Sequence, residues 1–424
     1  MSTAVRPGAA VPGRVRTGRW AWLAVLGPGL LAGLSDDDPP GITTYSVLGA
    51  AYGYQLLWVL LASTVALVGF HGLGVRMGIQ TGQGLIGLVR ERFGVRAGGA
   101  ALVVLLLANL GTTCAELAGV AAGSELFGVS RYVAVPLVMA GVCALVLKGS
   151  FHRVEHVLMA LAAVFLAYPV AAVITGPDWG AAARGLVVPS MPVTSDAVVL
   201  VTAAVGTTLA PWGLSFIQSY AVDKKLTMDD LGDERVDVVV GSVLTGVIGF
   251  FVVVTCAATL HRQGSRITDA ADAAEALRPL AGPLAHGLFA VGVVGAAVLA
   301  SAVVPLSTAY SVCEFAGHES GLDDGFRGAR LFYGSHVAVS ALAVAVVLWP
   351  GLPLVPVLVL TQVLNAVLLL PLLVFLYLLA RDPEVTGGQP VQGVRAAFYV
   401  VVIVAVAGCL AALGLLLLRA PSSW

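Results

Sequence analysis

The sequence predicts an all-α polytopic membrane protein, and three observations support this fold class. Of its 424 residues, 58% are hydrophobic and only 11% are charged, whereas a soluble domain carries about 25% charged residues. The mean hydropathy is positive, at +0.94. Apolar runs of the ~20 residues that a membrane-spanning helix needs recur from one end of the chain to the other.

Reading the apolar runs in order gives about eleven helices joined by short connections. They lie near 20–52, 56–76, 97–123, 131–147, 154–175, 196–220, 237–260, 284–315, 331–349, 354–380 and 394–418. Polar residues and prolines interrupt the first and the sixth of these segments. The order favours two halves of five helices followed by one extra helix.

This order divides the chain into three parts. Residues 1–19 are expected to form a cytoplasmic tail, 20–380 a ten-helix core, and 381–424 an eleventh helix with an extracytoplasmic C-terminus. Within the core, the two halves cover about 20–175 and 196–380. Most of the 23 Lys and Arg residues lie in cytoplasmic segments if the N-terminus is inside. The positive-inside rule favours that orientation, in a cytoplasmic membrane.

The composition also limits the classes of partner and cofactor that the protein can be expected to bind. The net charge of −1 gives no indication of a nucleic-acid partner. The expected partner is the surrounding lipid bilayer, and no obligate protein partner is evident. The five cysteines stand singly inside apolar runs without a CxxC pair. We therefore expect neither disulfides nor a thiolate metal site, and we predict no resident cofactor.

The first predicted helix is interrupted by Ser35, Asp36-Asp37-Asp38, Pro39-Pro40 and Gly41. Three carboxylates in mid-span are costly unless they face protein, water or a cation. The prolines remove two backbone donors and Gly41 weakens the helix further. The sequence therefore predicts an unwound segment whose carbonyls and carboxylates could hold a cation.

The sixth predicted helix is interrupted at the run from Thr207 to Gly213, which contains Ala210-Pro211-Trp212. Helices 1 and 6 are corresponding positions if helices 1–5 and 6–10 are two repeats. Paired interruptions of this kind indicate a binding site near the bilayer midplane of an inverted-repeat transporter. A single proline kink would also fit ordinary helix packing.

Several segments share a pattern with a known transporter family. They are Gly27-Pro28-Gly29, the Asp38-Pro39 pair, Ala51-Tyr52-Gly53-Tyr54, the run from Arg76 to Gly82, and Thr361-Gln362-Val363-Leu364. At these residues the chain resembles the Nramp divalent-metal transporters, and the resemblance extends over nearly all of it. It implies a leucine-transporter-like fold, with a 5+5 inverted repeat, discontinuous helices 1 and 6 and an eleventh helix. It also implies cation transport by alternating access.

The chain departs from the family pattern at three places. The helix 1 motif Asp-Pro-Gly-Asn reads Asp38-Pro39-Pro40-Gly41, without the Asn, and the helix 6 motif Met-Pro-His reads Ala210-Pro211-Trp212. In helix 3, Thr113 replaces the Asp of an Asp-x-x-Glu pair, and Glu116 remains. These changes look like those of the Nramp-related magnesium transporters, a branch that carries Mg²⁺ and Mn²⁺. That resemblance implies transport without proton coupling.

The resemblance places six residues at a metal site. They are Asp38 through its carboxylate, Ser35 and Ala210 through their carbonyls, Thr207 through its carbonyl or hydroxyl, Gln362 through its amide, and Gly41. The small residues at positions 41 and 210 would leave room for a hydrated ion. Oxygen donors suit hard cations, and Mg²⁺ keeps several of its waters. The donor set does not rank Mg²⁺ against Mn²⁺.

Other polar residues receive lesser roles. Asp36 and Asp37 are expected to line the approach to the site, and Glu116 to face a cavity or a polar partner. His71 is interpreted as a hydrogen-bonded packing histidine rather than a ligand, and Glu314 as a residue of the cytoplasmic mouth.

Three other functions stay open at this point. A proton-coupled Mn²⁺/Fe²⁺ carrier of the Nramp type would keep the same fold. An organic-substrate transporter for an amino acid or amine would also keep it, although Asp38 would repel a substrate carboxylate. A cation channel would need a repeated filter segment, and none is visible. No catalytic motif is recognisable, so we do not expect an enzyme.

Overall fold

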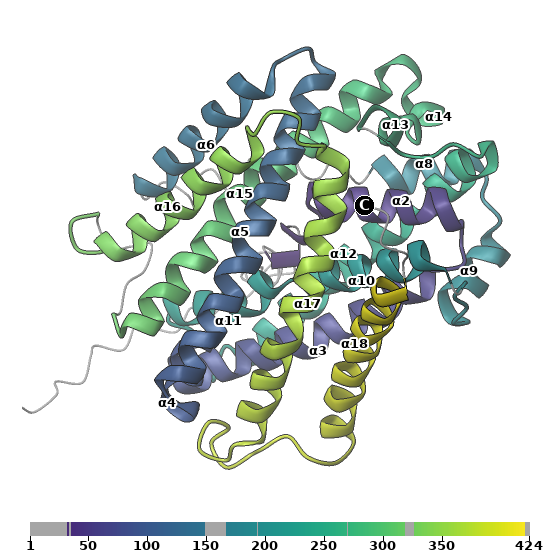
Figure 1. Ribbon diagram of the computed structural model, residues 1–424. Helices are drawn as coiled ribbons and strands as arrows, with labels where there is room; N and C mark the ends of the chain where they lie inside the picture. The colour runs from purple at the N-terminus through teal and green to yellow at the C-terminus, as the bar shows by residue number, and fades with distance from the viewer. Residues whose placement is uncertain are drawn as a thin grey trace, which may run out of the picture.

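The computed structural model describes residues 32–33, 35–148, 167–192, 194–268, 270–318 and 326–419. Within these ranges every regular element is a helix (Figure 1). The long helices are α3 (Leu57–Thr81), α5 (Val95–Leu126), α12 (Leu231–Cys256), α15 (Ala285–Ala316), α16 (Arg330–Val347), α17 (Leu354–Arg381) and α18 (Gly393–Arg419). Together they form one helical bundle.

Shorter helices connect or complete the long ones. They are α2 (Pro39–Tyr52), α4 (Leu85–Phe93), α6 (Arg131–Leu147), α8 (Ala167–Thr175), α9 (Trp179–Val187), α10 (Ser195–Thr208), α11 (Pro211–Asp223), α13 (Ala270–Glu275) and α14 (Arg278–Ala281). A π-helical turn, η3 (Ala257–His261), continues α12, and a 3₁₀ turn, η4 (Gly282–Leu284), precedes α15. The sequence did not predict α4, α9, α13 or α14, because these helices are too short to stand out in hydropathy.

The predicted membrane-spanning helices are largely confirmed. Eight helical segments of the described chain are long and apolar enough to cross a membrane, and Arg131–Leu147 is a shorter apolar helix. The predicted segment 196–220 is α10 and α11, separated at Leu209 and Ala210. The predictions for 1–31 and for 154–166 lie outside the described residues, as do Gly27-Pro28-Gly29.

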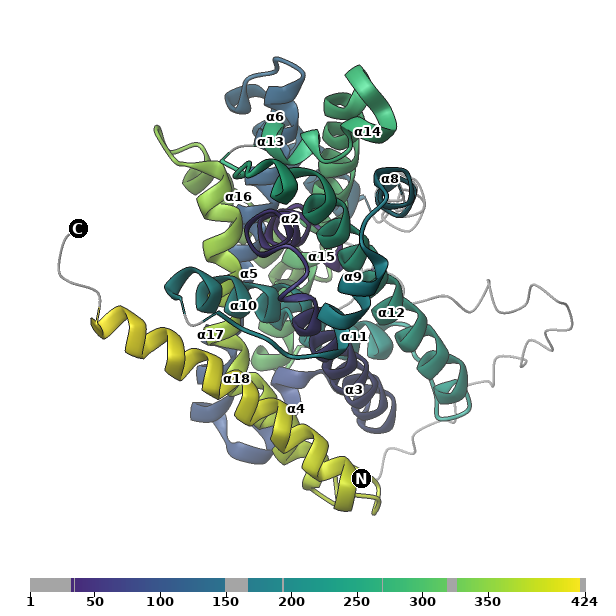
Figure 2. The ribbon, with the colours of Figure 1, turned by 90° about the vertical axis from the view of Figure 1, so that its right-hand side faces the viewer.

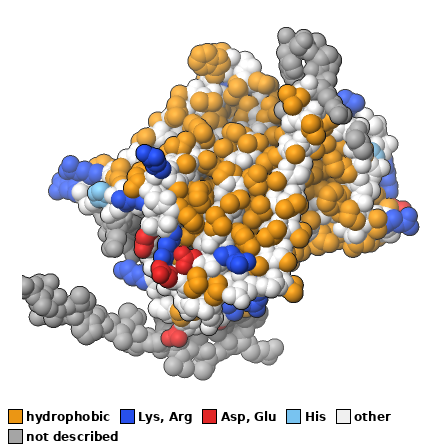
Figure 3. Space-filling model, turned by 60° about the horizontal axis from the view of Figure 1, so that its bottom comes forward, with side chains coloured by type: hydrophobic (Ala, Val, Ile, Leu, Met, Phe, Trp, Pro, Cys, Tyr) orange, Lys and Arg blue, Asp and Glu red, His pale blue; other side chains and the backbone are white. Residues whose placement is uncertain are grey.

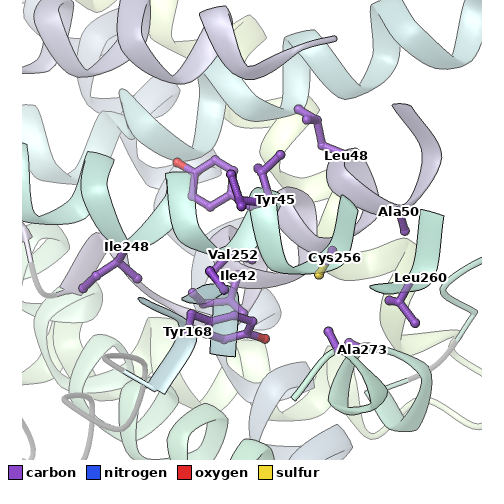
Figure 4. Packing of buried hydrophobic residues seen from close by; sticks show 14 of the residues in the cluster. Ile42, Tyr45, Leu48, Ala50, Tyr168, Ile248, Val252, Cys256, Leu260 and Ala273 are labelled. Carbon is purple, nitrogen blue, oxygen red and sulfur yellow. The ribbon is translucent and has the colours of Figure 1, made fainter. Parts of the chain in front are cut away.

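Helix packing places α2, α5, α10 and α17 around the centre of the bundle. α5 packs along α15 and α17, and α10 packs along α17. The second half of the interrupted first helix, α2, is packed against α12 and α8. Figure 4 shows Ile42 and Tyr45 of α2 among Tyr168, Val252 and Cys256, all of which are buried. This cluster fixes the position of α2.

The outer surface is apolar, as a bilayer requires. Hydrophobic side chains cover most of the face in Figure 3, and charged side chains gather mainly toward its edges. Leu107, Leu137, Leu360 and Val401 are among the exposed apolar residues. α18 lies on the outside of the bundle beside α17 (Figure 2). Only 11% of the most apolar 18-residue stretch of this helix is buried inside the protein. Exposed apolar side chains spread over so much of the surface indicate contact with lipid.

Candidate metal site

The first interruption lies at Asp37 and Asp38. Ser35 and Asp36 form part of a short helical stretch, the chain bends at the next two residues, and α2 begins at Pro39. Asp38 has an extended backbone and is the N-cap of α2, and its Oδ1 accepts a hydrogen bond from the Gly41 N–H at 2.6 Å. The prolines therefore begin the second half-helix rather than disrupt a helix interior, because proline is well tolerated at the first helical positions.

The second interruption lies at Leu209 and Ala210, and α11 begins at Pro211. Because Pro211 has no N–H, it cannot donate to the Thr207 carbonyl four residues earlier, as a helical residue would. The Ala210 carbonyl, predicted as a metal ligand, already has partners within α11. This carbonyl accepts from the N–H groups of Gly213 at 3.1 Å and Leu214 at 3.4 Å, because Ala210 is the N-cap of α11.

The two interruptions meet beside Gly41. A Cβ placed on this glycine would lie 2.9 Å from the Asp36 carbonyl oxygen, 2.9 Å from Asp38 Oδ1 and 3.2 Å from Thr207 Oγ1. Three oxygens from both broken helices therefore lie close to Gly41, and the missing side chain leaves room beside them. Gly41 itself is a helical residue of α2 whose N–H is bonded to Asp38. Its position supports the predicted role of leaving space.

Ser35 and Thr207, one from each interrupted helix, are both buried. Ser35 is 1% exposed and Thr207 is 3% exposed. Neither hydroxyl oxygen has a hydrogen-bond partner among the described residues. Buried hydroxyls are normally satisfied by protein or ordered water, so both oxygens are available to water or a cation.

Gln362 of α17 approaches the second interruption through Gly206. A Cβ on Gly206 would overlap the Gln362 backbone, so only glycine allows α10 and α17 this close. The Gln362 Oε1 accepts from Asn365 Nδ2 at 3.0 Å, and Asn365 Nδ2 also donates to Thr112 Oγ1 at 2.9 Å. The Gln362 amide is therefore held within a polar network that joins α17 to α5.

Glu116 of α5 completes the polar centre. Its carboxyl group lies next to that of Asp38, within reach of a hydrogen bond between the two side chains. Glu116 is fully buried and Asp38 is 4% exposed. Among the described residues, no Lys or Arg forms an ion pair with either group. Two buried carboxyl groups in contact require a proton or a cation between them.

Asp36 and Asp37 are as deeply buried as Asp38, at 2% and 1% exposed. Their four carboxyl oxygens have no hydrogen-bond partner among the described residues. They therefore lie inside the protein and not on an open surface, and their predicted role of lining the approach to the site stays a prediction. Asp36 also contributes its carbonyl to the oxygens beside Gly41.

The donor set is mostly oxygen. In the part of the chain that the structure describes, no three His, Cys, Asp or Glu side chains form a metal-binding group. A cation beside Gly41 would therefore depend on one or two carboxylates together with hydroxyl, amide, carbonyl or water oxygens. Such a set suits a hard, partly hydrated divalent cation.

Two residues outside the predicted set also stand out. His71 of α3 is 1% exposed, and its Nε2 lacks the hydrogen bond that a packing histidine would make within the described chain. Glu314 of α15 accepts from Ser219 Oγ at 2.5 Å and from the Ile86 N–H at 3.2 Å. It thereby joins α15, α11 and α4, a role that the sequence could not show because α4 was not predicted.

Comparison with known proteins agrees with this architecture. A family model described as natural resistance-associated macrophage protein-like, or Nramp, matches residues 29–416. The divalent metal cation transporter MntH of Burkholderia ambifaria is 30% identical over 385 residues, which are 88% of this chain and 84% of that protein.

Solved structures show the same fold. An Eremococcus coleocola manganese transporter superimposes with a TM-score of 0.75 at 18% identity, covering 96% of this chain and 91% of that one. The protein MhsT, solved in complex with L-phenylalanine, superimposes with a TM-score of 0.59 at 12% identity, covering 93% of this chain and 98% of that one. The predicted transporter fold with two discontinuous helices is confirmed, and the chain belongs to the Nramp family.

Proposed function

We propose that this protein carries divalent metal cations across the cytoplasmic membrane by alternating access. Its proposed substrates are partly hydrated Mg²⁺ and Mn²⁺. The observation that carries the proposal is the point beside Gly41, where oxygens of Asp36, Asp38 and Thr207 converge from both broken helices. The relative from Burkholderia ambifaria, named as a divalent metal cation transporter, supports the same substrate class.

The chemistry of the donors favours hard cations. Position 210 carries Ala, so no thioether contributes, and position 212 carries Trp212, which is 1% exposed. Carboxylate, hydroxyl, amide and carbonyl oxygens suit Mg²⁺ and Mn²⁺. Mg²⁺ is usually held by one or two carboxylates and several waters. The carboxylate of Asp38, with that of Glu116 nearby, therefore supplies enough negative charge to hold such an ion.

We also propose that transport is not coupled to protons. Thr113, which stands where the family has an Asp, donates its hydroxyl hydrogen to the Asn109 carbonyl at 2.7 Å and carries no titratable group. Trp212 stands where the family has a His. The driving force would then be the membrane potential. A divalent cation gains ~4.6 kcal/mol per 100 mV on entering a negative interior.

The proposal includes an orientation and excludes catalysis. The N-terminus would be cytoplasmic and the C-terminus extracytoplasmic, as the distribution of Lys and Arg favours. The metal ion is the cargo, so no resident cofactor and no obligate protein partner is needed. The protein would not be an enzyme.

The test is ion entry into liposomes that contain the purified protein, an internal metal dye and an internal pH dye. Wild type is compared with Asp38→Asn and Asp38→Ala. The Asn side chain can still accept from the Gly41 N–H, so it preserves the helix cap while removing the charge. We expect wild type to admit Mg²⁺ and Mn²⁺ without acidification, and both variants to lose this flux.

Other results would point elsewhere. Mn²⁺ entry with acidification and without Mg²⁺ entry would identify a proton-coupled carrier of the Nramp type. Normal flux in Asp38→Asn with loss only in Asp38→Ala would reduce Asp38 to a helix cap. A complete lack of metal flux in wild type would contradict the proposed substrate class and favour an organic substrate.

A further inference from the structure

A second polar position lies beside Gly213, in the first turn of α11. A Cβ placed on this glycine would lie 3.3 Å from His71 Nε2 and 3.9 Å from Asp36 Oδ1. An imidazole nitrogen from α3 and a carboxylate oxygen from the first broken helix therefore both lie within 4 Å of one point beside the Gly213 Cα. As at Gly41, a glycine leaves that point open.

Both atoms are buried and unsatisfied. His71 is 1% exposed and Asp36 is 2% exposed. Neither His71 Nε2 nor either carboxyl oxygen of Asp36 has a hydrogen-bond partner among the described residues. Buried polar atoms without partners are rare in native proteins and ask for a specific explanation, such as an ion or a water.

This position differs from the one beside Gly41 but adjoins it. The Asp36 carbonyl oxygen belongs to the oxygens beside Gly41, whereas the Asp36 carboxyl oxygen belongs to those beside Gly213. One residue of the broken helix therefore faces both positions. An ion that leaves the first position toward α11 would meet the second.

We propose that His71 and Asp36 form a second metal-binding position beside Gly213. This position takes Mn²⁺ and other transition-metal cations in preference to Mg²⁺. It rests on the proposed transport function and adds a selective step to it. A cation lying between His71 Nε2 and Asp36 Oδ1, in the space that a side chain at position 213 would narrow, would bind both donor atoms after small shifts of the two side chains.

The selectivity follows from the nitrogen donor. Imidazole binds first-row transition metals, whereas Mg²⁺ favours carboxylate, carbonyl and water oxygens. Mg²⁺ also dehydrates reluctantly and demands near-ideal octahedral geometry. A site with one nitrogen and one carboxylate therefore holds a transition metal longer than it holds Mg²⁺.

The first test detects the nitrogen directly. Mn²⁺ is added to the full-length purified protein, and electron spin echo envelope modulation records nitrogen nuclei bonded to the ion. We expect nitrogen modulation in wild type and its loss in His71→Gln. The matched control is His336→Gln, because His336 of α16 is also a fully buried histidine. This variant should keep the modulation.

The same measurement separates the two positions. In Asp38→Asn, nitrogen modulation should persist, because Asp38 belongs to the position beside Gly41. Loss of the modulation in both Asp38→Asn and His71→Gln would overturn the second position by indicating one shared site. Bound Mn²⁺ without nitrogen modulation in wild type would overturn this inference alone. A failure of wild type to bind Mn²⁺ would overturn the proposed function as well.

The second test fills the space and leaves both side chains in place. Gly213→Ala puts a methyl group 3.3 Å from His71 Nε2, whereas a Cβ on Gly72 of α3 would meet nothing within 4 Å. By titration calorimetry we expect Gly213→Ala to weaken Mn²⁺ binding about tenfold, a loss typical of a disturbed metal environment, with Mg²⁺ binding nearly unchanged. Gly72→Ala should leave both affinities as in wild type. Equal losses of Mn²⁺ and Mg²⁺ binding in Gly213→Ala would contradict the proposed selectivity.

Discussion

Gly119 of α5 lies directly against the ring of Pro39 of α2. A Cβ at position 119 would overlap the Pro39 side chain, so no other residue permits this approach without a shift of one helix. Glu116 lies one helical turn before Gly119 and on the same side of α5. The contact therefore places the Glu116 carboxyl group next to Asp38.

Substitution of Gly119 should consequently disturb the site without removing any donor. Gly119→Ala is expected to destabilise the protein by about 1–3 kcal/mol, as overpacking of a tight contact does, and to weaken Mg²⁺ and Mn²⁺ binding together. Thermal unfolding in detergent and metal titration measure the two effects. Gly141→Ala in α6 is the control, because a Cβ there would meet nothing within 4 Å. Unchanged stability and affinity in Gly119→Ala would show that α2 and α5 are not positioned by this contact.

Removal of the Thr207 hydroxyl should weaken metal binding. Thr207→Val keeps the shape of the side chain and deletes one of the three oxygens beside Gly41. A lost interaction of ~1 kcal/mol corresponds to an affinity about fivefold lower for both Mg²⁺ and Mn²⁺. The measurement is the dissociation constant by titration calorimetry.

Thr202 offers a matched control in the same helix. It is also fully buried, but its hydroxyl donates to the Val198 carbonyl at 2.7 Å and not toward the site. Thr202→Val should leave metal affinity unchanged. If both valine variants lose affinity equally, the effect comes from α10 stability and not from a ligand at position 207.

Glu314 should hold α4 in place. Its carboxyl group accepts from Ser219 Oγ and from the N–H of Ile86 near the start of α4. Glu314→Ala removes both acceptors and leaves Ile86 N–H without this partner, at a cost of about 1–3 kcal/mol. Hydrogen exchange of the amides in α4 should therefore accelerate.

A smaller effect is expected when only one of these contacts is removed. Ser219→Ala deletes one donor and leaves the carboxylate at the start of α4. Exchange in α4 should then rise less than in Glu314→Ala. Exchange rates that match wild type in both variants would show that α4 is held by its apolar face alone, through Leu85, Ile86 and Leu88.

The substrate ion itself should stabilise the fold. A ligand present at 100 times its dissociation constant adds ~2.7 kcal/mol to the free energy of unfolding. Mg²⁺ or Mn²⁺ should therefore raise the unfolding temperature of wild type, and a chelator should reverse the rise. Asp38→Asn should abolish the rise. The same upward shift in that variant would place the stabilising ion away from Asp38.

Sequence alone was a good guide to the helices that depend on local composition. The predicted helix 131–147 coincides with α6, and 284–315 differs from α15 by one residue at each end. Both helix interruptions were also predicted, because Pro39, Pro40 and Pro211 act on the backbone next to them. The ion carried, the orientation and the coupling remain predictions.

What sequence could not show depends on contacts between distant residues. The unsatisfied Nε2 of His71 becomes meaningful only when Gly213 and Asp36 are placed beside it. The close approach of Gly206 to Gln362 likewise joins residues far apart in the chain. The hydrogen bonds of the Ala210 carbonyl also went unpredicted, because an N-cap carbonyl accepts the first hydrogen bonds of the helix it begins.

The prolines at the start of α2 have a consequence for anions. A helix N-terminus ordinarily presents several free N–H groups, which makes it an anion-binding site. Here Pro39 and Pro40 have no N–H, the Gly41 N–H is bonded to the Asp38 carboxylate, and the Ile42 N–H is bonded to the Asp38 carbonyl. This helix end therefore offers no donor to a substrate carboxylate, chloride or phosphate. The N-terminus of a half-helix in this fold can bind an anion, but the N-terminus of α2 cannot.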